Sequence, residues 1–253
     1  MKFRTGGGDI AVNIATRAQL EAEVAARLAT GHGFALATLN LDHLVKLAAD
    51  PTFRAAYQTQ DPVVADGNPI VWLSRLARQP VDLMPGSDLV VPLARMAAQA
   101  GHPVALVGST DESLRQAAQA LKKAAPGLEI ACRIAPPFGF DPEGPGADAI
   151  LRQVGDSGAR LCFIALGAPK QERFAARGRV VAPGVGFASI GAGLDFLSGT
   201  QVRAPLWVRR LALEWLWRLL GQPRRMLMRY LQCMGILPGH LVRALMQRRH
   251  SGS

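Results

Sequence analysis

A short apolar run that ends at a glycine, with polar residues directly behind it, constrains the fold of this chain most. Residues 161–166 form such a run, and Gly167 and Pro169 end it. Six apolar residues are few for a helix and fit a strand that is buried on both faces, as in a parallel sheet. The polar residues that follow are Lys170, Gln171 and Glu172. We expect them at the carboxyl edge of the sheet, where open α/β sheets bind ligands, although a solvated charged loop is the competing interpretation.

The same pattern of a short apolar run followed by a helical segment recurs along most of the chain. Strands are expected at residues 10–14, 34–39, 63–65, 103–107, 128–134, 161–166 and 184–190. Helices are expected at residues 17–29, 42–49, 51–60, 70–78, 89–100 and 147–154, with one that ends at 124 and one that begins at 173. Strands that alternate with helices predict an α/β fold with a doubly wound parallel sheet and right-handed crossovers.

The positive charge is concentrated at the carboxyl-terminal end of the chain. Of a formal net charge of +10, residues 202–253 contribute +9, from ten arginines against the single acid Glu214. This contrast divides the chain into a nearly neutral α/β domain, residues 1–201, and a basic appendage, residues 202–253. A hydrophobic content of 49% argues against disorder. The basic surface suits an anionic partner, and a bilayer, a diphosphate and a nucleic acid all qualify.

The appendage also carries aromatic residues. It holds three of the four tryptophans, and helices are expected at residues 211–220, 224–237 and 241–246, with Pro238 and Gly239 separating the last two. Arginines next to Trp, Tyr and Leu on short helices are typical of an amphipathic anchor that lies in the membrane interface. A packing appendage with a solvated basic face is the main alternative, and base stacking on RNA is a third.

Several function classes lack their sequence signatures. No apolar run is long enough to span a membrane and the first ten residues do not resemble a signal peptide, so a cytoplasmic protein is expected. Cys132, Cys162 and Cys233 lie far apart, which predicts neither a disulfide nor a zinc site. The histidines show no metal-ligand spacing and no DxD occurs, so no metal site is expected. Without GxGxxG or a Walker A sequence, a dehydrogenase or a P-loop enzyme is disfavoured.

Polar residues at two other expected strand ends are candidates for chemistry. Asp66 follows the run 63–65 and precedes Gly67, which lets a ligand approach the backbone closely. A carboxylate in a partly closed pocket can accept a proton from a hydroxyl as a general base, although Asp66 can instead close a turn. Thr38 and Asn40 end the run 34–39, where they position a hydroxyl or cap the next helix.

Eight short motifs occur in a fixed order along residues 10–230. They are Thr38-x-Asn40, Asp66-Gly67, GSDL at 86–89, LVG at 106–108, LGAPKQE at 166–172, GAGLDFLSG at 191–199, RAP at 203–205 and EWLxRL at 214–219. Together they resemble the WecG/TagA/CpsF family of glycosyltransferases. The resemblance implies a Rossmann-like α/β domain with a carboxyl-terminal appendage that contributes to an active site at the membrane. It also implies transfer of a sugar from a UDP-sugar to a polyprenyl-diphosphate-linked saccharide on the cytoplasmic face of the bacterial membrane.

The resemblance implies roles for individual residues. Asp66 matches the catalytic base proposed for the family, with Thr38 and Asn40 beside it in the sugar and acceptor pocket and Gln171 near the donor. Substrate or nucleotide contacts are implied for Gly108, Gly167, Pro169, Lys170, Glu172, Gly193, Asp195 and Arg203, and diphosphate contacts for Arg218 and Arg225. Two positions depart from the family pattern. Leu83 and Met228 stand where the family usually has basic residues, and Arg229 is a shifted substitute for the second.

An inverting transfer without a metal cofactor follows from this resemblance. Asp66 would take the proton of the acceptor hydroxyl while UDP leaves from the opposite face of the sugar, and arginines would stabilise the departing diphosphate. The donor sugar stays open among N-acetylmannosamine, its uronic acid, glucose and glucuronate, and homo-oligomer formation is also open. A nucleic-acid-binding module would explain the charge but not the polar strand ends. Another nucleotide-dependent α/β enzyme would explain the sheet but not the appendage.

Overall fold

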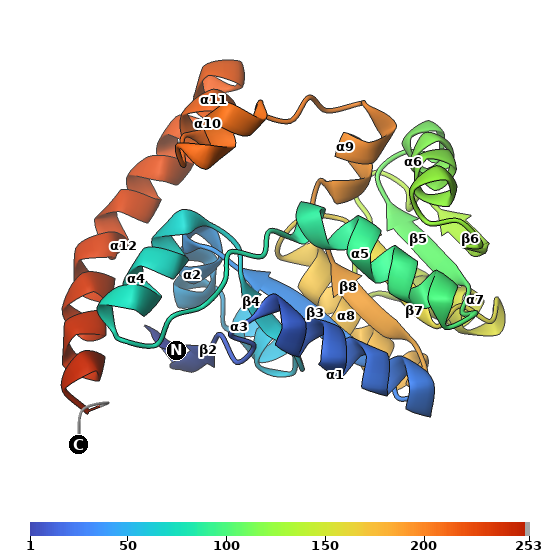
Figure 1. The fold of residues 1–253 in the computed structure, drawn as a ribbon, viewed down its shortest axis with the longest axis horizontal. Helices are drawn as coiled ribbons and strands as arrows, with labels where there is room; N and C mark the ends of the chain where they lie inside the picture. Colours follow the sequence, from blue (N-terminus) through green and yellow to red (C-terminus); the bar gives the residue numbers. More distant parts are fainter. Residues whose placement is uncertain (251–253) are drawn as a thin grey trace.

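The structure, a computed structural model, describes residues 1–250, except for the side chains of Arg225, Arg249 and His250. Its main sheet has six parallel strands in the spatial order β4-β3-β8-β7-β5-β6 (Figure 1). The strands are β3 (Phe34–Leu39), β4 (Val63–Ala65), β5 (Val104–Gly108), β6 (Ile130–Ile134), β7 (Leu161–Ala165) and β8 (Gly186–Ser189). The last of them along the chain, β8, lies beside the first, β3, so the strand order reverses inside the sheet. Open α/β sheets bind ligands at such a point of reversal.

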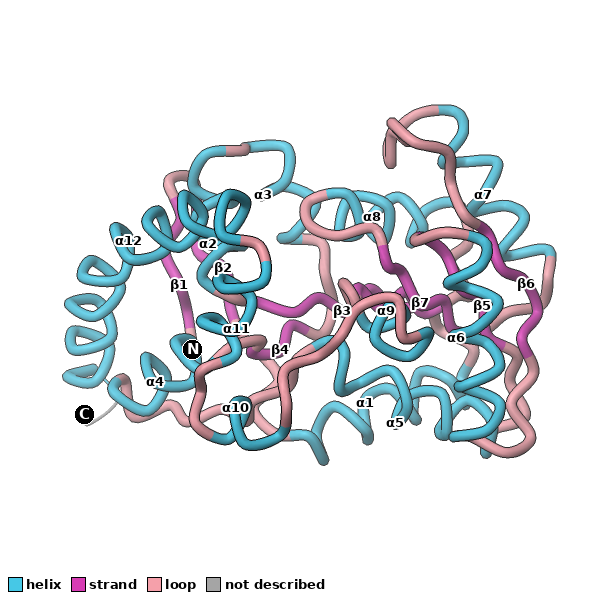
Figure 2. Tube along the Cα trace, turned by 90° about the horizontal axis from the view of Figure 1, so that it is seen from above, coloured by secondary structure: helices cyan, strands magenta, loops and turns pink. Residues whose placement is uncertain are grey.

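Helices cover both faces of this sheet (Figure 2). They are α1 (Arg17–Thr30), α2 (Leu41–Ala49), α3 (Pro51–Gln58), α4 (Asn68–Leu76), α5 (Gly86–Gln99), α6 (Asp111–Ala124), α7 (Pro145–Asp156), α8 (Lys170–Val181) and α9 (Gly193–Ser198). Phe34 and Leu36 of β3 pack with α1 and α5, whereas Ala35 between them packs with α7 and α8. Because both faces are covered, the strands are apolar throughout, and the predicted Rossmann-like doubly wound fold is confirmed.

The amino-terminal segment differs from its prediction. A hairpin of two antiparallel strands, β1 (Lys2–Thr5) and β2 (Gly8–Ala11), stands where the sequence predicts a single strand at residues 10–14. Gly6 and Gly7 join the two strands, and glycine pairs favour two-residue hairpin turns.

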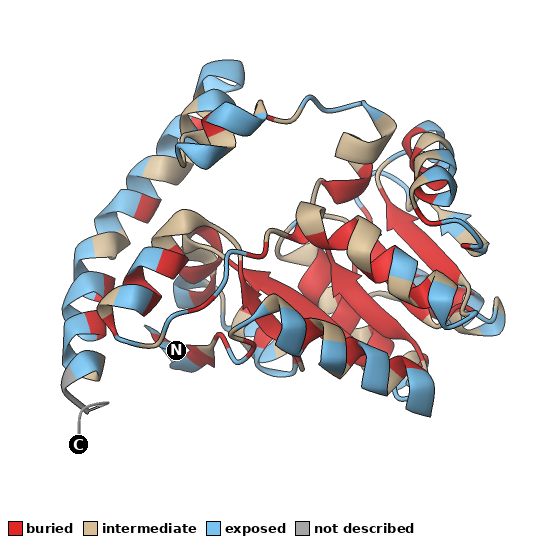
Figure 3. Cartoon of the chain, viewed as in Figure 1, coloured by how far each residue is buried: buried red, intermediate tan, exposed pale blue. Residues whose placement is uncertain are grey.

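The appendage consists of α10 (Leu206–Arg210), α11 (Glu214–Gly221) and α12 (Pro223–His250). The predicted break at Pro238 and Gly239 is wrong, because α12 runs through both as one helix. Pro238 removes one helical hydrogen bond, but α12 packs along α2 and α4, and its residues Cys233 and Ala244 are buried (Figure 3). Tertiary packing of this kind contributes more to helix stability than local propensity does. The division of the chain at residue 201 into two domains stays a prediction.

Much of the appendage surface is apolar and exposed. This apolar surface comprises Leu206, Trp207, Leu211, Trp215, Trp217, Leu220, Leu227, Met228, Leu231, Met234, Leu241, Val242, Leu245 and Met246. Many exposed large apolar side chains in one part of a protein are typical of interaction sites for membranes or partners. Among the residues that the structure describes, no helix combines the length and apolarity needed to cross a bilayer.

Candidate active site

Asp66 lies at the carboxyl ends of two neighbouring strands. β3 and β4 pair in parallel, with Leu39 opposite Ala65, so the residues that follow these strands emerge side by side. The Asp66 backbone N–H continues the ladder and donates to the Leu39 carbonyl oxygen at 2.8 Å. Two side chains from β3 and its end converge on Asp66 Oδ2: Thr38 Oγ1 donates at 3.4 Å and Asn40 Nδ2 donates at 3.3 Å. The structure thus brings together the three residues that the sequence placed at separate strand ends.

The start of α2 fixes the orientation of Asn40. Asn40 is the N-cap of α2, and its Oδ1 accepts from the His43 backbone N–H at 3.0 Å. In return the Asn40 backbone N–H donates to His43 Nδ1 at 3.2 Å, which completes a capping box. Because Oδ1 is held by the helix terminus, the amide nitrogen of Asn40 faces Asp66. Capping the helix and contacting Asp66 are therefore two functions of one side chain.

The surroundings of Asp66 favour its protonated form overall. Burial raises the pKa of the Asp66 carboxyl, and Glu214 raises it further. His43, Arg218 and the hydrogen bond from Asn40 oppose this by lowering the pKa. Asp66 is nevertheless partly exposed, so a substrate can reach it. A carboxylate that is reachable and has a raised pKa suits general base catalysis near neutral pH.

Gln171 and Glu172 lie beneath the surface of this site, in the first turn of α8. Gln171 and Glu172 are both buried, and Gln171 Nε2 donates to Glu172 Oε1 at 2.8 Å. Gln171 Oε1 accepts from the Gly191 backbone N–H at 3.1 Å, which ties α8 to the end of β8. Glu172 Oε1 also lies 3.5 Å from His43 Nε2. The PKQE motif is therefore linked to the capping box around Asp66.

Gly167, Pro169 and Lys170, which precede Gln171 in the same motif, contribute differently. Lys170 Nζ donates to the Phe140 carbonyl oxygen at 2.8 Å and so holds the loop between β6 and α7. Gly167 is exposed, and Pro169 precedes the first residue of α8 and follows a cis peptide bond. Since α8 begins at Lys170, earlier than predicted, the motif forms a helix start rather than a loop.

Asp195 forms a second polar cluster, near the end of β5. Its carboxylate accepts hydrogen bonds from the Ser109 and Ser113 hydroxyls and from Gln201 Nε2. Gly108, which ends β5, has a φ of 119°, and a Cβ there would lie 2.3 Å from the Ala165 carbonyl oxygen. Only glycine lets β5 and β7 approach so closely at this point. Gly193 is the first residue of α9, the helix that carries Asp195, and it is buried.

Two arginines of the appendage, Arg203 and Arg218, act electrostatically on Asp66. Arg203 pairs with Asp88 at the start of α5, and its guanidinium lies 5.7 Å from the centre of the Phe196 ring. Arg218 pairs with Glu214 at 2.6 Å and is close enough to lower the pKa of Asp66. Arg203 also interacts electrostatically with Asp66. The side chain of Arg225 lies outside the described residues.

The two positions that depart from the family pattern lie in different parts of the fold. Leu83 pairs with Ala65 in a one-residue parallel bridge and is 40% exposed, so it neighbours Asp66 across the edge of the sheet. Met228 is exposed on α12. The adjacent Arg229 forms an ion pair with Asp42 of α2 at 2.7 Å, so its charge is balanced within the protein.

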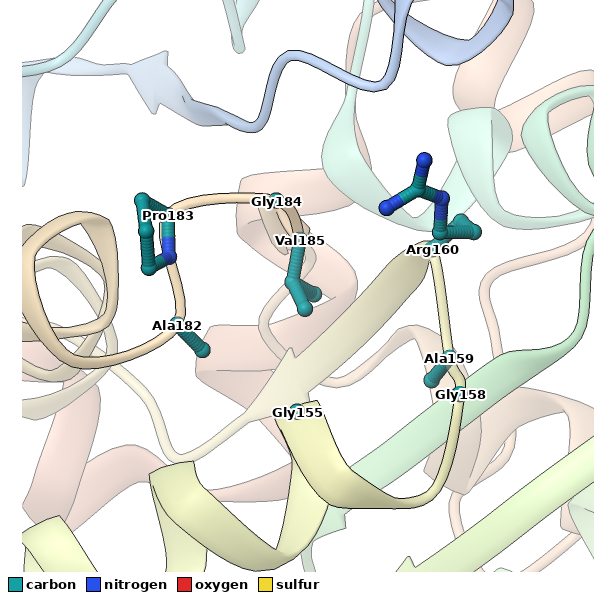
Figure 4. Close-up of a pocket in the computed structure, with 8 residues that line it drawn as sticks. All are labelled: Gly155, Gly158, Ala159, Arg160, Ala182, Pro183, Gly184 and Val185. Carbon is teal, nitrogen blue, oxygen red and sulfur yellow. The ribbon is translucent and has the colours of Figure 1, made fainter.

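A depression at the opposite edge of the sheet is unrelated to this site. It is lined by Gly155, Gly158, Ala159, Arg160, Ala182, Pro183, Gly184 and Val185 (Figure 4). These residues precede β7 and β8, at the amino ends of the strands. Among the described residues, no three His, Cys, Asp or Glu side chains gather in a way that would hold a metal ion.

Two residues of the site could not be predicted from the sequence. His43 completes the capping box of Asn40, but histidine replaces the usual Glu or Gln at that position of the motif, so the signal is weak. Tyr57 of α3 is fully buried, and burial, Glu172 and Asp66 raise the pKa of its hydroxyl. Nothing in the local sequence of α3 indicates that Tyr57 reaches the centre of the molecule.

The carboxyl edge of a doubly wound sheet, with a reachable carboxylate opposite arginines, is typical of enzymes that transfer a group from a nucleotide-linked donor. The comparison with known families agrees with this class. The model of the glycosyl transferase WecG/TagA/CpsF family matches residues 8–252, nearly the whole chain, and the chain belongs to this family. It is thus a glycosyltransferase of cell-surface polysaccharide synthesis, which uses a nucleotide-sugar donor and a saccharide acceptor.

Proposed function

We propose that this protein is an inverting hexosyltransferase that moves a sugar from a UDP-sugar to a polyprenyl-diphosphate-linked saccharide. Asp66 carries this proposal, because it combines a raised pKa with access from solvent and a fixed orientation. Both of its side-chain donors, Thr38 and Asn40, bond Oδ2. Within the described residues this leaves Oδ1 to receive the proton of the acceptor hydroxyl.

The bond changes of the proposed reaction balance without a further reactant. The acceptor oxygen attacks the anomeric carbon and loses its proton to Asp66, while the bond from that carbon to the β-phosphate oxygen of UDP breaks. Attack opposite the leaving group inverts the anomeric configuration. The leaving diphosphate gains negative charge, so cations that face the site accelerate the step.

Arginines of the appendage are the proposed source of that positive charge. Arg203 and Arg218 interact electrostatically with Asp66, which brings them close to a sugar bound at this edge of the sheet, and we assign them to the diphosphate that leaves from the far side of that sugar. Arg225 stands near the start of α12, the helix after the one that carries Arg218, and is proposed to act with them. Guanidinium groups form paired hydrogen bonds with phosphate oxygens, which makes a divalent cation unnecessary in this proposal.

The appendage is also proposed to hold the enzyme on the cytoplasmic face of the membrane, where a polyprenyl-linked acceptor resides. Its apolar surface includes Trp207, Trp215 and Trp217, and arginines lie on the same helices. Tryptophan and arginine both favour the interface between lipid headgroups and acyl chains. Each basic residue near an anionic surface adds about 1 kcal/mol to binding, so a peripheral attachment is sufficient.

A donor screen tests the proposed function. The purified full-length protein is incubated with UDP-linked N-acetylmannosamine, N-acetylmannosaminuronate, glucose and glucuronate, each with polyprenyl-diphosphate saccharides in anionic vesicles, and products are read by mass spectrometry. We expect one donor to extend the lipid-linked saccharide by one residue. Control reactions use a GDP-linked sugar as the donor or an oligosaccharide without the diphosphate lipid as the acceptor, and transfer in these controls alone would contradict the proposal.

A further inference from the structure

We propose that His43 and Glu172 form a positioning pair that holds Asn40, and through it Asp66, in the geometry for proton transfer. This inference rests on the proposed role of Asp66 as the base. Neither residue contacts a reacting atom in this account. Glu172 orients the imidazole, the imidazole holds the Asn40 backbone, and the Asn40 amide hydrogen bonds Asp66.

The first link runs from Asp66 to α2. Asn40 can bond Asp66 Oδ2 through its nitrogen only while its oxygen points the other way. The His43 backbone N–H holds that oxygen at 3.0 Å, and His43 Nδ1 holds the Asn40 backbone N–H at 3.2 Å. The second of these bonds depends on the imidazole, so a variant without an acceptor at residue 43 loosens the Asn40 backbone that carries the amide.

The second link runs from α2 to α8. His43 Nδ1 accepts from the Asn40 backbone, so in the neutral imidazole the proton lies on Nε2. His43 Nε2 faces Glu172 Oε1 at 3.5 Å, and Gln171 Nε2 donates to the same oxygen at 2.8 Å. The carboxylate thus selects the tautomer whose other nitrogen can accept from Asn40, as a carboxylate behind an imidazole does in many enzymes.

Burial separates this role from ligand binding. The Glu172 side chain is 0% exposed and that of His43 is 6% exposed, so neither can reach a substrate. Within the described residues, Glu172 Oε2 and the buried Tyr57 hydroxyl have no hydrogen-bond partner. A buried carboxylate with an unsatisfied oxygen is costly, and such groups persist where they serve function. Glu172 therefore acts behind the site rather than in it.

Four variants of the full-length protein separate positioning from packing. His43→Leu removes the acceptor of the Asn40 backbone N–H, and His43→Gln restores it, because a Gln side chain at this position can also accept from the N-cap N–H. Glu172→Gln keeps the shape of the buried side chain and removes its charge. His32→Gln is the matched control, since His32 is exposed and lies at the amino end of β3. Each is assayed for the rate of sugar transfer, for UDP affinity by calorimetry and for thermal unfolding.

We expect His43→Leu to lower kcat roughly 10- to 100-fold while UDP affinity stays that of the wild type, as misplacement of a catalytic group does, and His43→Gln to recover most of this loss. We expect Glu172→Gln to lower kcat while UDP affinity stays that of the wild type, and His32→Gln to change neither quantity. A kcat of His43→Leu equal to that of the wild type would overturn the inference, and so would a kcat of His43→Gln as low as that of His43→Leu, or loss of UDP affinity in Glu172→Gln with kcat unchanged. Asp66→Asn separates the two proposals. If it transfers sugar at the wild-type rate, the proposed base is wrong; if it is inactive and His43→Leu behaves as wild type, only the positioning pair is wrong.

Discussion

Replacing Asn40 with Asp tests the electrostatics of the site while leaving the helix cap in place. Asp and Asn cap helices equally well, so Asn40→Asp should still accept from the His43 backbone N–H and fold as the wild type. The change removes the amide donor to Asp66 Oδ2 and places a second carboxylate beside it. The two carboxylates then behave as a coupled pair, in which one proton is held more tightly than either group holds it alone.

The size of the expected shift in the acid limb follows from the distance between the side chains of residues 40 and 66. Two charges 3.3 Å apart repel by about 5 kcal/mol at an effective dielectric constant of about 20, which is roughly 3–4 pKa units. Rearrangement of the new side chain reduces this, and we expect the acid limb of kcat/KM to move up by about 2 pH units. At a pH below the acid limbs of both enzymes, kcat/KM of Asn40→Asp is then roughly 100-fold lower than that of the wild type.

Asn40→Ser is the matched control for this prediction. Serine also caps helices well, and it removes the amide without adding a charge. Initial rates of sugar transfer are measured from about pH 5 to 9 for both variants, and thermal unfolding checks that both are folded. If the acid limbs of Asn40→Asp and Asn40→Ser coincide, the Asn40 side chain does not sit beside the base and the reasoning is refuted.

Three further predictions address the metal, the membrane and the fold. UDP should bind with the same affinity in EDTA and in Mg²⁺ by calorimetry, and binding that requires the ion would contradict the role of the arginines. Changing Leu206, Trp207 and Leu211 to Ser should weaken sedimentation with anionic vesicles at least roughly tenfold, because each loses about 1.5–3 kcal/mol of apolar burial. Trp72→Ser, at an exposed tryptophan of α4, is the control that should bind as the wild type. Gly108→Ala should lower the unfolding temperature, because its Cβ would meet a carbonyl oxygen of β7 at 2.3 Å; an unchanged temperature would show that β5 and β7 can separate freely.

The sheet and the position of Asp66 were predictable because they depend on local periodicity. Apolar runs mark buried strands, and in a parallel sheet the residue behind each run emerges at the same edge. This rule placed Thr38, Asn40 and Asp66 at that edge, and pairing of β3 with β4 brought them into contact. That β3 and β4 are neighbours in the sheet could not be predicted from the sequence, because strand order depends on the packing of the whole domain.

The remaining features depend on contacts between distant segments. Glu172 contacts His43 although the two residues are 129 positions apart in the chain, and no local pattern indicates such a contact. Pro238 predicts a helix end, yet α12 continues because it packs along α2 and α4. The family resemblance implies a substrate or nucleotide contact for Lys170, whereas in the structure its ammonium group donates to the Phe140 carbonyl oxygen.

The most direct test of the central claim is the rate of sugar transfer by Asp66→Asn, measured together with its affinity for UDP. Asn keeps the size of the side chain and cannot accept the proton of the acceptor hydroxyl. We predict that turnover falls by about 10²–10⁴ while UDP affinity and thermal unfolding stay close to those of the wild type. Turnover at the wild-type rate would show that Asp66 is not the base and would contradict the account.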